Sequence, residues 1–288
     1  MSDKSDRFKF ERSLAVLATM PLLERELGLT IQASAGLNTD CFGTFTREIE
    51  RAGSQLDAAR AKIAAAFQMF PATRIGIASE GSFGPHPHLP FVALGRELVL
   101  FYDRTTRLEL SGYDASSDTN FAHRVVSNID EVIAFADQID FPKHGLVIIA
   151  SKRGEPDTAR YVIKDALTHS ALEAAVQKVL ADSGQAFIET DMRADRNPTR
   201  MAAIARATAD LVRRCRSRCP DCAYPGFDIT ERLVELPCEW CGEPTRLIHT
   251  LVLACNACGH RIDKPASDRV TADTGQSALR ATMIGHLR

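Results

Sequence analysis

Six cysteines near the C-terminus form the most specific chemical pattern in the chain. They make three C-x-x-C pairs, Cys219/Cys222, Cys238/Cys241 and Cys255/Cys258, which are separated by 15 and 13 residues. Each pair presents two thiolates from one tight turn, and two such turns complete a tetrahedral zinc site. In a chain whose N-terminus is unlike a secretory signal, this clustering favours metal over disulfides. The spacing therefore predicts structural zinc, with a redox dithiol as the alternative interpretation.

Three pairs are an odd number for sites with four ligands, so the sequence leaves the pairing open. One zinc ion would use two pairs, either neighbouring pairs or the first with the third, and the remaining pair would stay reduced. A second site would instead have to be completed by Cys215, His249 or His260. A module of this length builds only a small core, so we expect metal binding, worth about 10–16 kcal/mol, to supply most of its stability.

Polar clusters in the first 200 residues contain the groups that phosphate chemistry uses. They lie at residues 44–51, 79–82, 118–124 and 189–200, where strands and helices are expected to meet. Carboxylates such as Glu80 bind a metal or orient water, and Lys and Arg bind phosphate oxygens. Each cluster also has a structural interpretation. Glu80 would then be an exposed turn residue, residues 44–51 a solvated face, and residues 189–200 a helix-capping network.

The elements that position these clusters alternate between strands and helices. We expect strands at residues 13–19, 29–34, 74–79, 144–151 and 160–165, and a hairpin of 96–104 with 107–114. We expect helices at residues 21–27, 54–70, 128–139, 169–183 and 198–214, of which the first and last open with Pro. This order predicts an α/β fold with one mixed sheet flanked by helices, followed by a small zinc ribbon.

The expected organisation is a charged N-terminal tail (1–12), an α/β domain (13–214), a zinc-ribbon module (215–265) and a C-terminal tail (266–288). The 288 residues are 45% hydrophobic and 25% charged, which is ordinary for a soluble globular protein. No apolar run is long enough to span a membrane. A net charge of −2 excludes non-specific nucleic-acid binding by the chain as a whole. We expect a protein of the reducing cytoplasm without a membrane partner.

The order of the clusters resembles the superfamily of inosine/xanthosine triphosphate pyrophosphatases and Maf-type nucleotide pyrophosphatases. The likeness rests on short segments at residues 17–19, 44–62, 78–81 and 193–200. A more specific likeness, over most of the chain, is to an uncharacterised bacterial domain family with a Cys-rich tail. It is carried by TDCFGTFTREIERAGSQ, ASEGSFGPHP, ETDMRADRNPTRM and the CPDC/CEWC/CNAC series. This second family brings no established activity.

The pyrophosphatase resemblance implies that the chain binds a nucleotide or a related phosphate compound with Mg²⁺. It further implies that the protein is a hydrolase that releases pyrophosphate from a nucleoside triphosphate. Catalytic roles are implied for Glu80 and Glu48 as metal-binding carboxylates and for Lys62 as a phosphate ligand. The implied substrate-binding residues are Arg47, Arg51, Ser79, Ser82, Arg193, Asp195, Arg196, Asn197 and Arg200. Asp195 stands where the second family usually has His, and it would accept from an exocyclic amino group of the base.

The segment that leads into the ribbon suggests a second class of function. Arg213, Arg214, Arg216 and Arg218 form a local basic patch that could meet the phosphates of a nucleic acid. Cations at a helix end also complement the helix dipole, which is the structural interpretation. The alternative function is therefore a non-catalytic nucleotide sensor, or an adaptor that binds nucleic acid or protein through the ribbon.

Overall fold

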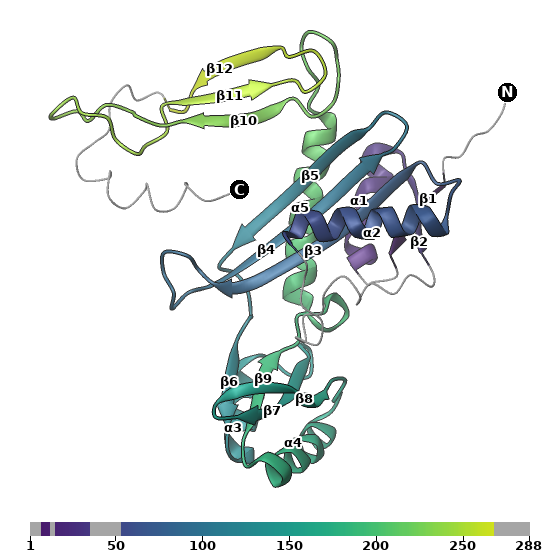
Figure 1. Ribbon diagram of the computed structural model, residues 1–288, viewed down its shortest axis with the longest axis vertical. Helices are drawn as coiled ribbons and strands as arrows, with labels where there is room; N and C mark the ends of the chain where they lie inside the picture. Colours follow the sequence, from purple (N-terminus) through teal and green to yellow (C-terminus); the bar gives the residue numbers. More distant parts are fainter. Residues whose placement is uncertain (1–6, 12–14, 35–52, 268–288) are drawn as a thin grey trace. The chain divides into compact units, whose positions relative to one another are not determined.

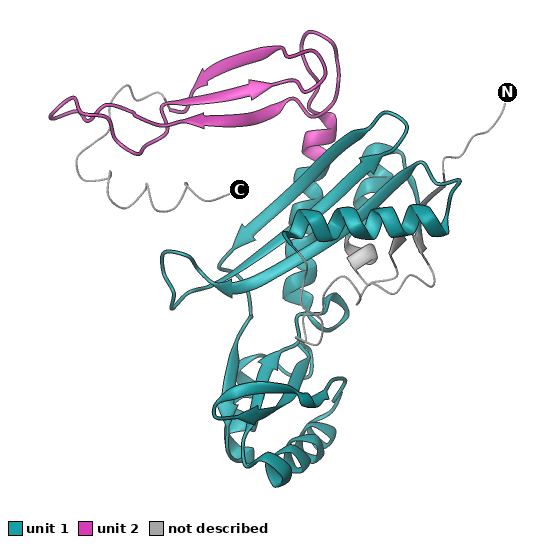
Figure 2. Cartoon of the chain, viewed as in Figure 1, with its two compact units in different colours: residues 1–211 teal, residues 212–288 magenta. Residues whose placement is uncertain are grey.

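The described part of the first 211 residues contains two β-sheets, where the sequence predicted one. The chain, in a computed structural model, divides into two compact units, residues 1–211 and 212–288 (Figure 2). The structure describes residues 7–11, 15–34 and 53–267. The first unit is mixed α/β as expected, but each of its sheets has its own helices and core (Figure 1).

The first sheet has five strands in the order β2-β1-β3-β4-β5. Their bounds are β1 Arg7–Glu11, β2 Thr30–Ser34, β3 Ile75–Pro85, β4 Ala93–Asp103 and β5 Leu108–Ser116. β1 is parallel to both β2 and β3, whereas β3, β4 and β5 form an antiparallel meander. The predicted hairpin of β4 and β5 is confirmed.

The second sheet is antiparallel, with four strands in the order β6-β9-β7-β8. Its strands are β6 His123–Val126, β7 Leu146–Lys152, β8 Glu155–Ile163 and β9 Ala186–Thr190. Helices α3 (Ile129–Gln138) and α4 (His169–Ser183) pack on one face, and Phe135, Ile148 and Leu172 are at most 1% exposed in the shared core. The sequence prediction missed β6 and β9, so it merged this layer with the first sheet.

Two predictions near the N-terminus are wrong. Residues 7–11 belong to β1, inside the sheet, and not to a charged tail, because RFKFE alternates charged and aromatic residues with the period of a strand. Residues 13–19 were expected to form a strand, but helix α1 spans Ala15–Leu27 with Pro21 inside it. Thr19 and Leu23 are four residues apart and fully buried, as on one face of a helix.

Strand β3 is longer than predicted, and this changes the position of Glu80. The strand was expected to end at residue 79, with Glu80 in the following loop. Instead, residues 75–85 pair without interruption with residues 103–93 of β4. Glu80 therefore lies in the middle of a strand and is 5% exposed, so it is not the exposed turn residue of the alternative interpretation.

Helices α2 (Gln55–Met69) and α5 (Pro198–Arg216) cover opposite faces of β3, β4 and β5. On one face, Ile63 of α2 packs against Ala78 and Leu100. On the other face, α5 approaches β5 so closely that a Cβ at Gly112 would lie 2.1 Å from the Ala207 carbonyl oxygen. Only glycine permits this backbone-to-backbone contact.

The second unit contains an antiparallel three-stranded sheet in the order β10-β11-β12. Its strands are β10 Asp228–Leu233, β11 Thr250–Ala254 and β12 Arg261–Pro265. Asp228 pairs with Ala254 at one end of the β10–β11 ladder, and Leu233 pairs with Thr250 at the other. Residues 234–249 connect the strands at this second end.

Candidate functional site

Glu80 and Lys62, which come from two different predicted motifs, are in contact. The Lys62 ammonium lies 2.6 Å from the Glu80 carboxylate, and the two side chains are 13% and 6% exposed. Lys62 lies on α2, so the pair is formed on the face of the sheet that α2 covers. This is the one contact between predicted catalytic residues in the described part of the chain.

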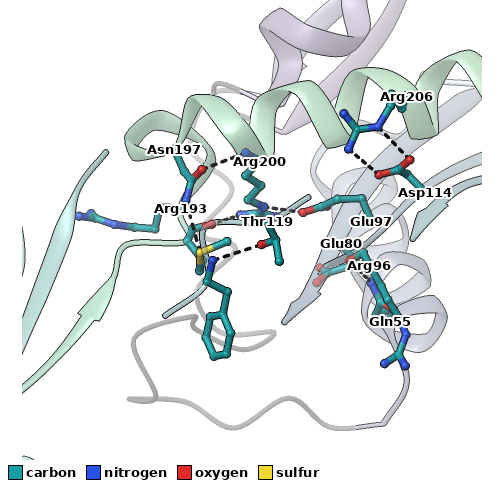
Figure 3. Close-up of polar contacts among 12 residues, drawn as sticks. Gln55, Glu80, Arg96, Glu97, Asp114, Thr119, Arg193, Asn197, Arg200 and Arg206 are labelled. Carbon is teal, nitrogen blue, oxygen red and sulfur yellow. Dashed lines mark hydrogen bonds and ion pairs between the residues drawn. The ribbon is translucent and has the colours of Figure 1, made fainter. Parts of the chain in front are cut away.

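Gln55, in the first turn of α2, fixes the helix to the strands beside this pair. Its Nε2 donates to the backbone carbonyl oxygens of Glu80 and Arg96 at 2.9 and 3.1 Å (Figure 3). Its Oε1 accepts from the Tyr113 hydroxyl. Burial raises the pKa of Tyr113, which keeps it a hydrogen-bond donor. Gln55 thus fixes the backbone at Glu80, whose carboxylate contacts Lys62.

The opposite face of the same strands holds a second buried carboxylate, Glu97, which the sequence analysis missed. Arg200 of α5 donates from Nε to Glu97 Oε1 at 2.7 Å (Figure 3). Burial raises the pKa of Glu97, Arg200 opposes this, and the negative charge of Glu80 adds to the rise. A Cβ at Gly81 would lie 2.6 Å from Glu97 Oε1, so the small residue beside Glu80 makes room for this ion pair. The sequence feature that could have identified Glu97 is its position as a single acid beside the apolar residues of RELVLF.

The register of β3 distributes the predicted residues 79–82 between these two faces. Alternate residues of a strand point to opposite faces. Glu80 and Ser82 therefore lie on the α2 face, and Ser79, which is buried, lies on the α5 face. The predicted site does not form as one cluster, because Glu80 and Arg200 are on opposite faces of the sheet.

The predicted basic segment forms a network of internal contacts at the start of α5. Asn197 Oδ1 accepts from the Arg200 backbone N–H, as a helix N-cap does, and Pro198 follows at the first helical position. Asn197 Nδ2 donates to Asn120 Oδ1 and to the Asp191 carbonyl oxygen. Arg200 also donates to the Met192 carbonyl oxygen at 2.5 Å. These bonds join the segment after β5 to the segment after β9.

Arg193 and Arg196 are held by carboxylates of the same region. Arg193 lies 2.6 Å from Asp191 and 2.8 Å from Asp165. Arg196 lies 2.9 Å from Asp165 and 3.5 Å from the predicted ligand Asp195. Burial raises the pKa of Asp165, but the two arginines outweigh it and hold that pKa below its ordinary value. The contacts match the capping-network interpretation of residues 189–200.

Three further predicted site residues, Arg47, Glu48 and Arg51, lie outside the described residues.

In the second unit, four of the six paired cysteines come together. The sulfur atoms of Cys219, Cys222, Cys255 and Cys258 all lie within 4.8 Å of one another. The first and third pairs therefore form the cluster, which is one of the arrangements that the sequence left open. The hairpin register explains the choice, because Asp228 pairs with Ala254 and brings the two segments that precede and follow them to one end of the sheet.

The distances between these sulfur atoms suit a metal ion such as zinc. Cys219 Sγ and Cys258 Sγ are 3.7 Å apart, and Cys222 Sγ and Cys255 Sγ are 3.6 Å apart. A disulfide would need about 2.05 Å. Thiolates at about 2.3 Å from a tetrahedral zinc lie about 3.8 Å from one another. Backbone N–H groups of Cys258 and Ala257 hold the pKa of Cys255 at about 7, which favours the thiolate that binds metal.

The basic patch before the ribbon makes contacts within its own unit. Arg213 and Arg214 lie 2.8 and 3.4 Å from Asp228, and Arg218 donates to the Ala223 carbonyl oxygen. Burial raises the pKa of Asp228, but the hydrogen bonds from Arg213 and from the backbone hold it below its ordinary value. Part of the patch thus anchors the end of α5 to β10.

These features define an α/β protein with a C-terminal cysteine-rich module that could bind a metal. The chain belongs to the family described as "Domain of unknown function (DUF6671)", which matches residues 63–272. The match includes Glu80, Glu97, Arg200 and all three cysteine pairs. The comparisons with curated proteins and with solved structures gave no match. In the described part of the chain, no helix has the length and apolar character needed to cross a membrane.

Proposed function

We propose that this protein binds a nucleotide or a related phosphate compound with Mg²⁺ on the α2 face of the five-stranded sheet. Hydrolysis of a nucleoside triphosphate to release pyrophosphate is the reaction class that we assign to it. Zinc in the four-cysteine cluster has a structural role in this proposal. The observation that carries it is the buried contact between Lys62 and Glu80, which joins a candidate phosphate ligand to a candidate metal ligand.

Charge balance supports such a site. A lysine and a glutamate that are 13% and 6% exposed neutralise one another in the free protein. On binding, Lys62 would exchange its carboxylate partner for a phosphate oxygen, and Glu80 would contact Mg²⁺. Both charges then keep a partner of opposite sign, so no uncompensated charge is buried. Mg²⁺ would supply positive charge that stabilises the negative charge developing on the pyrophosphate leaving group.

Gln55 and Tyr113 would keep the carboxylate in place during this exchange. Gln55 binds the backbone of both strands, so Glu80 stays at a fixed depth below α2 when its lysine partner moves. The arginines of residues 193–200 are not part of this site, because they are engaged in the network described above on the far side of the sheet. In the proposal, Arg200 joins the two sheets of the unit through Glu97 and the Met192 carbonyl oxygen, and Arg193 and Arg196 stabilise the segments beside the second sheet.

A thermal-shift panel of nucleoside triphosphates, with and without Mg²⁺, tests the proposal, together with a pyrophosphate-release assay. We expect at least one triphosphate to raise the Tm in the presence of Mg²⁺, and Glu80→Gln and Lys62→Met to abolish the shift. Glu97→Gln is the matched control, because it neutralises a buried carboxylate of the same strand pair on the opposite face and should keep the shift. The proposal fails if the panel gives neither a shift nor pyrophosphate, or if the Glu80 and Glu97 variants lose binding equally.

A further inference from the structure

The three C-x-x-C turns have the same backbone geometry, although only two of them form the four-cysteine cluster. In each turn, the N–H of the first cysteine donates to the carbonyl oxygen five residues later. The pairs are Cys219 to Tyr224, Cys238 to Glu243 and Cys255 to His260, at 2.9, 2.8 and 2.9 Å. The backbone N–H of the residue four places after the first cysteine donates to the carbonyl oxygen of that cysteine. These residues are Ala223, Gly242 and Gly259, at 2.9, 2.9 and 3.0 Å.

The same three residues also share a left-handed backbone, with φ values of 60°, 73° and 75°. Glycine adopts this conformation freely and Ala223 adopts it at an energetic cost, so its presence at the same position of all three turns indicates one shared turn geometry. Two of the turns present thiols at distances that suit a metal ion. The turn at Cys238 and Cys241 is therefore folded as half of a metal site.

This half-site cannot share the metal of the four-cysteine cluster. The cluster lies at the end of the sheet where Asp228 pairs with Ala254, and the Cys238 turn lies beyond the other end, where Leu233 pairs with Thr250. Five to six residues of strand, or about 17 Å, separate the two ends. Figure 2 shows the segment after β10 extending from this second end.

The residues of the same chain that the sequence suggested as ligands for a second metal site do not form a cluster with this turn. Among the described residues, the four-cysteine cluster is the one group of three or more potential ligands placed for a metal. His260 belongs to the turn at Cys255, Cys215 lies in α5, and the His249 ring is hydrogen-bonded to the Thr250 hydroxyl. Two more soft ligands are needed for a tetrahedral thiolate site.

Exposed apolar side chains occur in the half-site and in the strand that leads to it. Trp240, between the two cysteines, is 86% exposed, and Leu233 and Val234 at the end of β10 are 42% and 49% exposed. A large aromatic side chain in this position is typical of protein interfaces. Trp240 therefore exposes a large aromatic side chain within the half-site itself.

We propose that Cys238 and Cys241 bind a second zinc ion together with the same two residues of a second copy of the chain. A two-fold axis places one patch against itself, so one pair becomes four thiolates. Each of the four thiols loses its proton to solvent as the metal binds. The contact also covers Trp240 and the neighbouring apolar side chains of both copies. The second copy is thus the partner that completes the site.

Metal analysis and light scattering of the zinc-loaded full chain test this inference. We expect a dimer with about three zinc ions per two chains. The double variant Cys238→Ser/Cys241→Ser should be monomeric at the same concentration, with about one zinc per chain. That remaining zinc shows that the ribbon is still folded. Cys215→Ser removes a thiol outside the three turns and should leave both the mass and the zinc content unchanged.

Three outcomes would overturn the proposal. A monomer with two zinc ions would mean that one chain completes the site. One zinc per chain in both proteins would mean that the turn does not bind metal. A double variant that stays dimeric would place the interface elsewhere. In contrast, Trp240→Ala should keep the zinc content of the dimer and raise its dissociation constant about tenfold or more, as loss of an interface tryptophan does.

Discussion

Lys62 Nζ of α2 lies 2.6 Å from Glu80 Oε1 of β3, in a region where neither side chain is more than 13% exposed. The pair joins a helix to the centre of the five-stranded sheet through opposite charges. Because both groups have left water, the opposite charge at 2.6 Å compensates part of the cost of burying each of them. This compensation is measurable whether or not the site binds a phosphate.

Replacing one member of this pair should cost more than replacing both. We expect Lys62→Met alone to lower the free energy of unfolding by about 3 kcal/mol, because Glu80 is left buried without its cation. The double variant Lys62→Met/Glu80→Leu should regain most of the loss. Far-UV circular dichroism in urea is the suitable probe, because the single tryptophan, Trp240, lies in the other unit. Additive losses in the double variant would show that the two residues do not depend on each other.

Asn197 should be the most sensitive residue of the network that joins the two sheets. It is fully buried, caps α5 through Oδ1, and donates to Asn120 and Asp191 through Nδ2. We expect Asn197→Ala to cost about 2–4 kcal/mol, since a cap is lost and buried acceptors lose their donor. Asn197→Ser can still cap the helix and should recover about 1 kcal/mol. Equal stability of the two variants would exclude the capping contribution.

The close approach of α5 to β5 depends on Gly112. A Cβ there would lie 2.1 Å from the Ala207 carbonyl oxygen and 2.3 Å from the Leu211 nitrogen. We expect Gly112→Ala to destabilise the first unit by about 3 kcal/mol, because backbone atoms cannot yield as a side chain does. Gly84→Ala, in β3 of the same sheet, is the control, since nothing lies within 4 Å of its added Cβ. Similar melting temperatures for the two variants would contradict the packing described.

Asp103 should make the free energy of unfolding depend on pH in the acidic range. Burial raises its pKa, but hydrogen bonds from Arg74, from the Thr105 N–H and from the Thr106 side chain bring it down to about 2. A carboxylate with a lowered folded-state pKa stabilises the protein above its unfolded pKa of about 3.9, and loses this contribution as the pH falls towards 2. We expect Asp103→Asn to be less stable at pH 7 and to lack this acid-dependent loss.

Asp140→Asn is the matched control for this pH series. Its side chain is 64% exposed beside Lys143, and its backbone is left-handed, which Asn tolerates. The control should keep the pH profile of the unaltered chain. If both variants keep that profile, Asp103 does not set the acid sensitivity.

Local patterns predicted much of the helix content and the meander, but they could not define the sheets. The helices at α2, α3 and α4 and the β4–β5 hairpin have clear periodicities. β9 is only five residues long and is fully buried, so its sequence AFIET has no alternation that marks it as a strand. β1 lies far from β3 in the sequence but pairs with it. Such long-range pairing, and not local propensity, divides the strands into two sheets.

The candidate sites show the same contrast between local sequence patterns, which can be predicted, and long-range contacts, which cannot. C-x-x-C spacing identified the cysteines of the cluster that could bind a metal, because this chemistry is contained in four consecutive positions. The pairing of first with third turn depends on the β10–β11 register, which the spacing does not encode. Glu97 was missed because an acid in an apolar strand gains meaning only from Arg200, 103 residues away along the chain.

Glu80 and Glu97 are separated only by the thickness of one sheet, and they face opposite sides of it. The negative charge of Glu80 helps to raise the pKa of Glu97. If the proposed site binds a cation at Glu80, that cation would lower the proton affinity of Glu97 and strengthen the ion pair between Glu97 and Arg200. Arg200 also donates a hydrogen bond to the carbonyl oxygen of Met192, where the chain leaves the second sheet. An ion bound to Glu80 on the α2 face would thus stabilise the contact of Arg200 with Glu97 on the α5 face through electrostatics across the sheet.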